Sequence, residues 1–199
     1  MSVSEQPDPP LASTLFGVLW RPRTTFAGLR GFPSARPGAS AIAILGMVWG
    51  ALSLLLWSAG HPAKRVLLPI DPASWYLIQG VLMLPLLTAL WWLHSEIAHR
   101  LCRRAGGGGA EAEVRLALGF AYAAPMTLHV VAELVAFMGW GMSGLRAVAV
   151  VTMPAAALGA WILSGIALHE LHRVRGAVAA GAAFAGLLVQ AAVGALVLR

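Results

Sequence analysis

The sequence predicts an all-α, polytopic membrane protein with five transmembrane helices and a short amphipathic segment before them. Five apolar stretches of about 20 residues fill most of the chain, and about 20 residues are what a helix needs to cross a hydrocarbon core of about 30 Å. Leu, Ala, Trp and Met follow one another there in no alternating order, which indicates helices rather than barrel strands. The predicted spans are residues 39–59, 75–93, 116–138, 148–168 and 177–198.

The tail formed by residues 1–38 is predicted to contain two short helices that lie at the membrane surface. Apolar residues recur at helical spacing from Leu11 to Arg30, so this segment is too polar to span a bilayer and too apolar to stay in water. Pro22 favours the first position of a helix, so the two helices should meet near Trp20 and Arg21. The expected membrane-interface residues are Trp20 and Phe26 at headgroup depth, with Arg21, Arg23 and Arg30 on phosphates. Alternatively, the tail packs against the cytoplasmic end of the bundle formed by residues 39–199.

Small residues inside the predicted spans mark the expected helix contacts. They are Gly46 and Gly50 in the first span, Ala156, Ala160 and Ser164 in the fourth, and Gly181 and Ala185 in the fifth. Such rows form packing seams within one chain or dimerisation faces between two, so a homo-oligomer is left open. Pro85 and Pro125 lie well inside the second and third spans, where each removes a backbone hydrogen bond and should kink its helix. The kinks fit either irregular packing or a substrate pathway.

One pair of ionisable residues lies within a predicted span. His129 and Glu133 are four residues apart and therefore share a face of the third helix. A carboxyl group in lipid is costly, so it normally faces the protein interior and has a partner. The pair is a candidate for proton or cation handling, or it has a structural or interfacial role near the outer end of the span.

Two histidine clusters follow the second span and end the fourth. Their candidate metal ligands are His94, Glu96, His99, His169 and His172. A spacing of three residues puts two side chains on one helical face, as in carboxylate and histidine metal sites. Alternatively, histidine and arginine are simply favoured at the C-terminal ends of helices by the macrodipole. Motifs of zincins, phosphate loops, nucleophile elbows and dinucleotide folds do not occur.

The basic residues fall mainly on alternate connections between the predicted spans. One side holds Arg21, Arg23, Arg30, Arg36, Arg100, Arg103, Arg104, Arg115, Arg173 and Arg175, and the other holds Lys64, Arg65, Arg146 and Arg199. Ten against four predicts that the N-terminus is cytoplasmic and the C-terminus lies outside.

The composition fits this interpretation and excludes others. The net charge of +6 comes from cations close to span ends, where they set topology and meet anionic headgroups, so nucleic-acid binding is not expected. Cys102 is the sole cysteine, which excludes a disulfide framework. Residues 1–38 carry no secretory h-region, so the first span is expected to direct membrane insertion. Arginine in place of lysine, with abundant Ala and Gly, is typical of a GC-rich bacterial genome and favours an inner-membrane location.

Several local patterns recur in a known order. They are Pro22, Thr25 and Phe26 before the first span; a histidine and a basic stretch that lead into Gly106–Gly109; EAEVR before a third span that opens FAYAAP, with Tyr122 and Pro125; and a fourth span that contains Trp161 and ends ALHELHRV. An Ala-rich fifth span follows. In this order the chain resembles the YIP domain family, the Ypt/Rab-interacting-protein type of five-span membrane protein, and in particular its bacterial branch.

The resemblance implies five spans and a cytoplasmic N-terminus, in agreement with the arginine distribution. For eukaryotic members it implies association with small GTPases and trafficking partners through the N-terminal region. That region is only about 38 residues here, and the resemblance transfers no catalytic residues.

Three functions follow from these observations. The first is a non-enzymatic integral membrane protein that organises or binds partners, without a cofactor, through its tail and cytoplasmic loops. The second is a small transporter or ion-coupled protein that uses His129, Glu133 and the two proline kinks. The third, and weakest, is a membrane metalloprotein built on the histidine clusters. The expected partners are the lipid bilayer and a protein at the cytoplasmic face.

Overall fold

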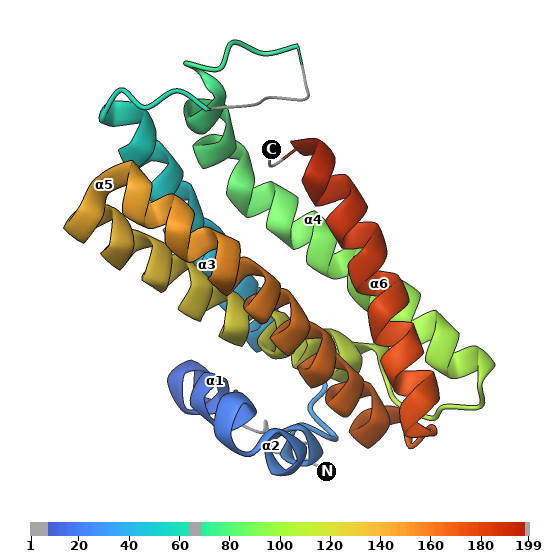
Figure 1. Cartoon of the computed structure of the whole chain (residues 1–199). Coiled ribbons are helices and arrows are strands. Elements are labelled where there is room, and N and C mark those ends of the chain that lie inside the picture. Colours follow the sequence, from blue (N-terminus) through green and yellow to red (C-terminus); the bar gives the residue numbers. More distant parts are fainter. Residues whose placement is uncertain (1–7, 64–68, 198–199) are drawn as a thin grey trace.

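The computed structural model describes residues 8–63 and 69–197, and every regular element within these ranges is a helix. Two short helices come first, and four long ones follow (Figure 1). Their bounds are α1 Leu11–Trp20, α2 Pro22–Gly28, α3 Arg36–Ser58, α4 Trp75–Arg104, α5 Glu111–His172 and α6 Gly176–Val197. The prediction of an all-α fold is therefore confirmed. The four long helices are each long and apolar enough to cross a membrane.

The longest helix, α5, doubles back on itself. A straight helix of its 62 residues would be about 93 Å long, about three times the hydrocarbon core of a bilayer. At Gly141 the backbone leaves the helical region, with φ 63° and ψ −153°, angles that glycine adopts without a steric penalty. His129 and Thr152, on either side of this point, are in hydrogen-bond contact at 2.7 Å. Residues 111–140 and 142–172 therefore form two arms that run side by side (Figure 1).

Two ends of the bundle can be defined from these contacts. At the basal end, the Gly108 amide donates to the His172 carbonyl at 3.3 Å, which joins the α4–α5 connection to the end of α5. The tail helices α1 and α2 also pack at this end, beside both arms of α5 (Figure 1). At the distal end, the ring of His61 meets Phe137, close to the reversal at Gly141.

Glycine allows α3 and α4 to approach at backbone distance. An added Cβ at Gly46 would lie 2.9 Å from Leu84 Cα, and one at Gly50 would lie 2.7 Å from the carbonyl oxygen of Gly80. The predicted Gly46–Gly50 row is thus a packing seam within the chain. The row that begins at Gly181 and Ala185 is not a packing seam within the chain, because Gly181 is exposed with no atom within 4 Å of an added Cβ.

The helix α4 is longer than the predicted second span. The helix continues past residue 93 to Arg104, so that Arg100, Arg103 and Arg104, which were expected in the connection, are helical. An ion pair of 2.5 Å between Glu96 and Arg100, one helical turn apart, supports this extension. Arg103 and Arg104 occupy its last turn, where positive charge favours the helix dipole.

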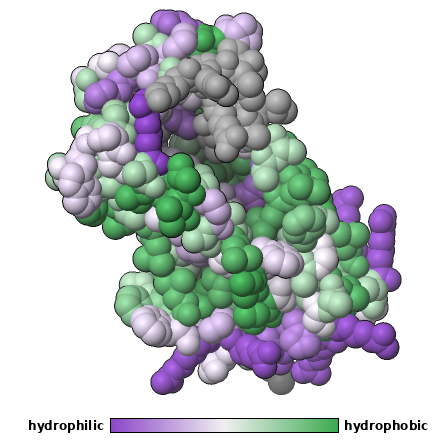
Figure 2. All heavy atoms as spheres, in the orientation of Figure 1, coloured by the Kyte–Doolittle hydropathy of each residue, from purple (hydrophilic) through white to green (hydrophobic). Residues whose placement is uncertain are grey.

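Large apolar side chains remain exposed on all four long helices. They include Met47 and Trp57 on α3, Val81 on α4, Leu128, Val135, Val150 and Val151 on α5, and Phe184 and Leu188 on α6. Figure 2 shows hydrophobic side chains across the body of the bundle and many hydrophilic ones at its basal end. This distribution is that of a protein whose sides face lipid.

Candidate functional site

The intramembrane candidates His129 and Glu133 lie where the two arms of α5 meet. His129 is buried, and its Nδ1 lies 2.7 Å from Thr152 Oγ1. The Thr152 hydroxyl donates its proton to the carbonyl of Val148 at 3.0 Å, so it accepts from His129 Nδ1–H. His129 Nε2 is then the acceptor nitrogen of the neutral ring, 3.5 Å from Glu133 Oε1.

The pair also contacts α3 and packs beside the second arm of α5. Trp49 of α3 meets the His129 ring edge-on, with 5.8 Å between ring centroids. Among the residues that the structure describes, His129 is the sole ion-pair partner of Glu133, which is 8% exposed. Cβ of Pro125 lies 3.2 Å from the Cβ position of Gly159, so the opposite arm packs directly against the proline. These contacts give the pair a structural part in joining the arms and count against a polar transport path beside it.

The five predicted metal ligands do not converge. His94 Nδ1 lies 3.3 Å from Gln190 Oε1 on α6, and Glu96 pairs with Arg100 and, at 3.2 Å, with Arg115. His169 Nδ1 donates to the carbonyl of Val174 at 2.7 Å. Within residues 8–63 and 69–197, no group of three or more His, Cys, Asp or Glu side chains is placed to hold a metal ion. The expected metal site does not form, because the ends of α4 and α5 bring together one histidine from each cluster, His99 and His172.

That meeting brings His99 of α4 against His172 of α5. Their ring centroids are 5.1 Å apart, and the rings are tilted by 42°. The amide of Gly109 donates to His172 Nδ1 at 3.1 Å, which places the proton of the neutral ring on Nε2. A protonated Nε2 offers no lone pair to a metal. The α4–α5 connection therefore sets the tautomer of His172. It also covers the His172 ring, since an added Cβ at Gly107 would lie 2.7 Å from Nδ1.

A second polar group at the basal end ties α4 to the start of α5. Arg115 pairs with Glu96 at 3.2 Å and with Glu111 of its own first turn. Its guanidinium lies 5.5 Å from the ring centroid of Trp92, and its carbonyl accepts from Trp91 Nε1 at 3.1 Å. Sequence analysis counted Arg115 among the arginines that set the membrane topology. In the structure Arg115 also holds α4 against the start of α5.

The tail is fastened to both ends of α5. Arg30 Nε donates to the carbonyl of Glu170 at 3.1 Å, and its Nη2 contacts that carbonyl and, at 3.3 Å, Glu170 Oε2. The amide of Gly31 donates to Glu113 Oε1 at 2.7 Å. Sequence analysis assigned Arg30 to lipid phosphate. A protein carboxylate and carbonyl bind it instead, because α2 packs against α5.

The tail residues divide between the core and the surface. The expectation that Phe26 lies at headgroup depth is wrong, because it is 0% exposed and shares the hydrophobic core with Val18 and Leu29. Trp20 is 74% exposed, and Arg21 and Arg23 are exposed as well. The prediction of two helices that meet near residues 20 and 21 is confirmed.

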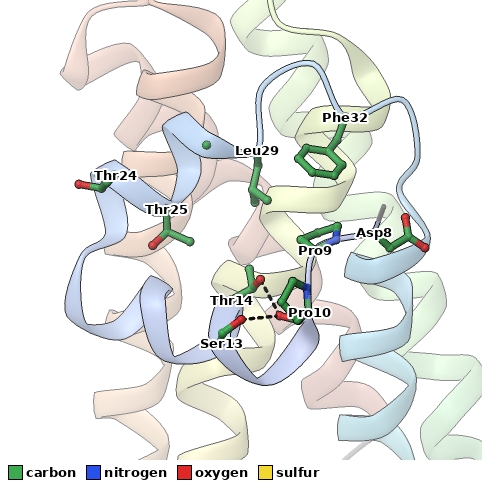
Figure 3. A pocket seen from close by; sticks show the side chains of 10 residues that line it. Asp8, Pro9, Pro10, Ser13, Thr14, Thr24, Thr25, Leu29 and Phe32 are labelled. Atoms are coloured by element: carbon green, nitrogen blue, oxygen red, sulfur yellow. Dashed lines mark hydrogen bonds between the residues drawn. The ribbon is translucent and has the colours of Figure 1, made fainter. Parts of the chain in front are cut away.

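A surface groove of about 400 Å³ lies between the two tail helices (Figure 3). It is lined by Asp8, Pro9, Pro10, Ser13, Thr14, Thr24, Thr25, Gly28, Leu29 and Phe32. The hydroxyl groups of Ser13 and Thr14 both donate to the carbonyl of Pro10, at 3.1 and 2.8 Å, and Thr25 donates to that of Arg21. The hydrogen-bond donors of these hydroxyls are therefore satisfied within their own helices.

Two residues that carry the packing were missed by sequence reasoning. Gln190 is 4% exposed and binds His94, and Gly38 meets Gly119, whose added Cβ would lie 2.6 Å from the Gly38 carbonyl oxygen. A glutamine within an apolar stretch was an available signal, since a polar side chain in lipid normally has a partner. Gly38 had no signal, because it precedes the apolar stretch.

Comparison of the chain with protein-family models, curated proteins and solved structures found no match.

Proposed function

We propose that this chain crosses a membrane five times, with its basal end in the cytoplasm and its distal end outside. The two arms of α5 support two crossings, because each has the length that a hydrocarbon core requires and the reversal at Gly141 lies between them. The excess of arginine at the basal end supports the orientation. Lys64, Arg65 and Arg199, which enter the same comparison, lie outside the described residues. A bacterial inner membrane is the location that the composition favours.

We propose further that the protein is non-enzymatic and of the YIP type, and that it organises or binds a protein partner at its basal end. The YIP type rests on the order of local sequence patterns alone, and the observation that carries the partner-binding part is a cluster of exposed arginines at one end of a bundle with apolar sides. The cluster consists of Arg100, Arg103 and Arg104 at the end of α4 and Arg173 and Arg175 between α5 and α6. The contact between Gly108 and His172 joins these two segments. A surface of this charge favours a partner with an acidic segment.

The test compares two charge-neutralising variants in native membranes. Arg104→Gln with Arg175→Gln removes two exposed basal charges, and Arg146→Gln removes one exposed charge near the distal end. Each variant carries a photo-crosslinking residue at position 108, and crosslinked proteins are identified after purification. We expect a discrete partner with the unchanged chain and with Arg146→Gln, and a several-fold weaker crosslink with the double variant. Equal crosslinking in all three would exclude the arginine cluster as the binding surface.

A further inference from the structure

The first tail helix, α1, is apolar on the side that faces away from the bundle as well as on the side that faces it. Its inner side places Thr14 and Val18 in buried positions, with Leu11 and Leu15 packed against the core. Its outer side carries an apolar ridge formed by Phe16, Leu19 and Trp20, which are 67%, 37% and 74% exposed. Leu19 and Trp20 follow Phe16 by three and four residues, so both lie beside it on the helix surface. A ridge of large apolar side chains exposed on a folded protein marks a contact with a membrane or a partner.

Charge indicates what covers the ridge. The segment from Leu11 to Gly28 contains no Asp or Glu, and its two arginines, Arg21 and Arg23, are exposed directly after the ridge. Arg30, by contrast, is held by Glu170. An aromatic and aliphatic ridge followed by free guanidinium groups is complementary to the boundary between acyl chains and anionic headgroups. Tryptophan in particular favours this boundary.

Packing of α1 on the bundle makes this surface part of the membrane-facing body. Its inner side contacts α5, whose arms expose Leu128, Val131, Val150 and Val151 along their length. The ridge is thus an apolar surface on the same body as the lipid-facing sides, at the end where the arginines gather. The contacts of Arg30 and Gly31 with α5 hold the tail there.

We propose that the ridge of Phe16, Leu19 and Trp20 is a docking surface for the anionic leaflet of the bilayer that the bundle crosses, with Arg21 and Arg23 on lipid phosphates. The proposal rests on the membrane placement given under the proposed function. It differs from the sequence-based expectation in its residues, because Phe26 and Arg30 point into the protein. Docking fixes α1 in the plane of the interface and leaves the arginines of α4 and of the α5–α6 connection for a protein partner.

The experiment uses the full chain, with Cys102→Ala, in nanodiscs that contain lipid and no other protein. A fluorescent label is attached at Phe16→Cys, at Thr24→Cys as the matched tail control on the groove side, or at Val150→Cys as the lipid-facing control. Quenching by lipids that carry a spin label high on the acyl chain reports contact with the interface. We expect strong quenching at positions 16 and 150 and several-fold weaker quenching at position 24.

The lipid composition tests the charge part of the proposal. Arg21→Gln with Arg23→Gln should reduce quenching at position 16 in nanodiscs of phosphatidylglycerol, and should change it little in those of phosphatidylcholine. Quenching at position 150 without quenching at position 16 would overturn the proposal and would instead assign the ridge to a protein partner. Absence of quenching at position 150 would overturn the membrane placement itself, so the two failures are distinguishable. The nanodiscs contain no other protein, so both quenching results are independent of the photo-crosslinking experiment described under the proposed function.

Discussion

At the residue scale, the hydrogen-bond partners of a few buried polar groups decide how the bundle is held together. His129, His94 and Ser53 each place a polar atom against a polar atom of a neighbouring helix or arm. Lipid provides no water to replace such a partner, so its removal leaves a buried group unsatisfied. Glycines also hold the bundle together, because they let α3 approach α4 and the first arm of α5 at backbone distance.

The pair of His129 and Thr152 leads to a stability prediction. Thr152→Val removes the acceptor of His129 Nδ1–H and should destabilise the protein by about 1–3 kcal/mol, the cost of an unsatisfied buried donor. Thr88→Val is the matched control, because Thr88 also donates to the carbonyl four residues before it but is exposed. Thermal unfolding in detergent micelles measures both variants. Equal melting temperatures would show that the contact between the arms contributes nothing.

Close contact of α3 with the first arm of α5 leads to a second prediction. Gly119→Ala places a methyl group 2.6 Å from the Gly38 carbonyl oxygen and should cost about 1–3 kcal/mol by overpacking. Gly181→Ala on α6 meets nothing within 4 Å and should stabilise slightly, since alanine favours the helix. The midpoint of thermal unfolding, measured in one detergent, compares the two. A Gly119→Ala protein as stable as Gly181→Ala would contradict the packing of these helices.

At the scale of elements, the tail is attached to the bundle at two points. Val18 and Phe26 lie in the same hydrophobic core as the long helices, and Arg30 and Gly31 contact the two ends of α5. Deletion of residues 1–36 would therefore remove part of the core as well as the tail. Single substitutions are the better means of testing what the tail does.

Substitution of Arg30 tests this attachment. The Arg30→Ala variant loses its bonds to the carbonyl and the carboxylate of Glu170, and should raise the rate of hydrogen exchange in α2 several-fold. The expected loss of stability is small, about 1 kcal/mol, because the Arg30 side chain is 36% exposed and water screens the ion pair. Arg23→Ala is the control, because Arg23 is an exposed arginine within α2, whereas Arg30 lies two residues beyond the end of that helix. Unchanged exchange in α2 would mean that apolar packing alone holds the tail.

At the scale of the whole molecule, the proposal of five membrane crossings depends on the reversal of α5 at Gly141. Five crossings place the N-terminal tail and Ser143 on opposite sides of the membrane. With Cys102→Ala as background, a cysteine at Ser143 should react with a membrane-impermeant maleimide in intact cells. A cysteine at Ser13 should react only after the membrane is opened. Labelling of both sites in intact cells would contradict the proposed topology.

Sequence analysis predicted the helices better than their contacts. The break at Pro22 and the Gly46–Gly50 seam could be predicted because each follows from local steric rules. The length of α4 could not, because residues 94–104 are polar enough for a connection and become helical where they pack against α6 and α5. The histidine clusters were misjudged for a related reason. Spacing along one helix predicts which face a residue occupies. It does not predict which residue of a neighbouring helix packs against that face.

The sequence by itself determined that the chain is helical, that its long helices are apolar enough for a membrane, and that a two-helix tail precedes them. These properties depend on composition and on periodicity within a single helix. The tertiary structure alone decided that Phe26 lies in the core while Phe16 and Trp20 lie outside, that Arg30 binds Glu170, and that His99 meets His172 without a third ligand. The physical reason is that periodicity defines the faces of a helix, whereas the neighbour that covers each face is set by how all the helices pack together.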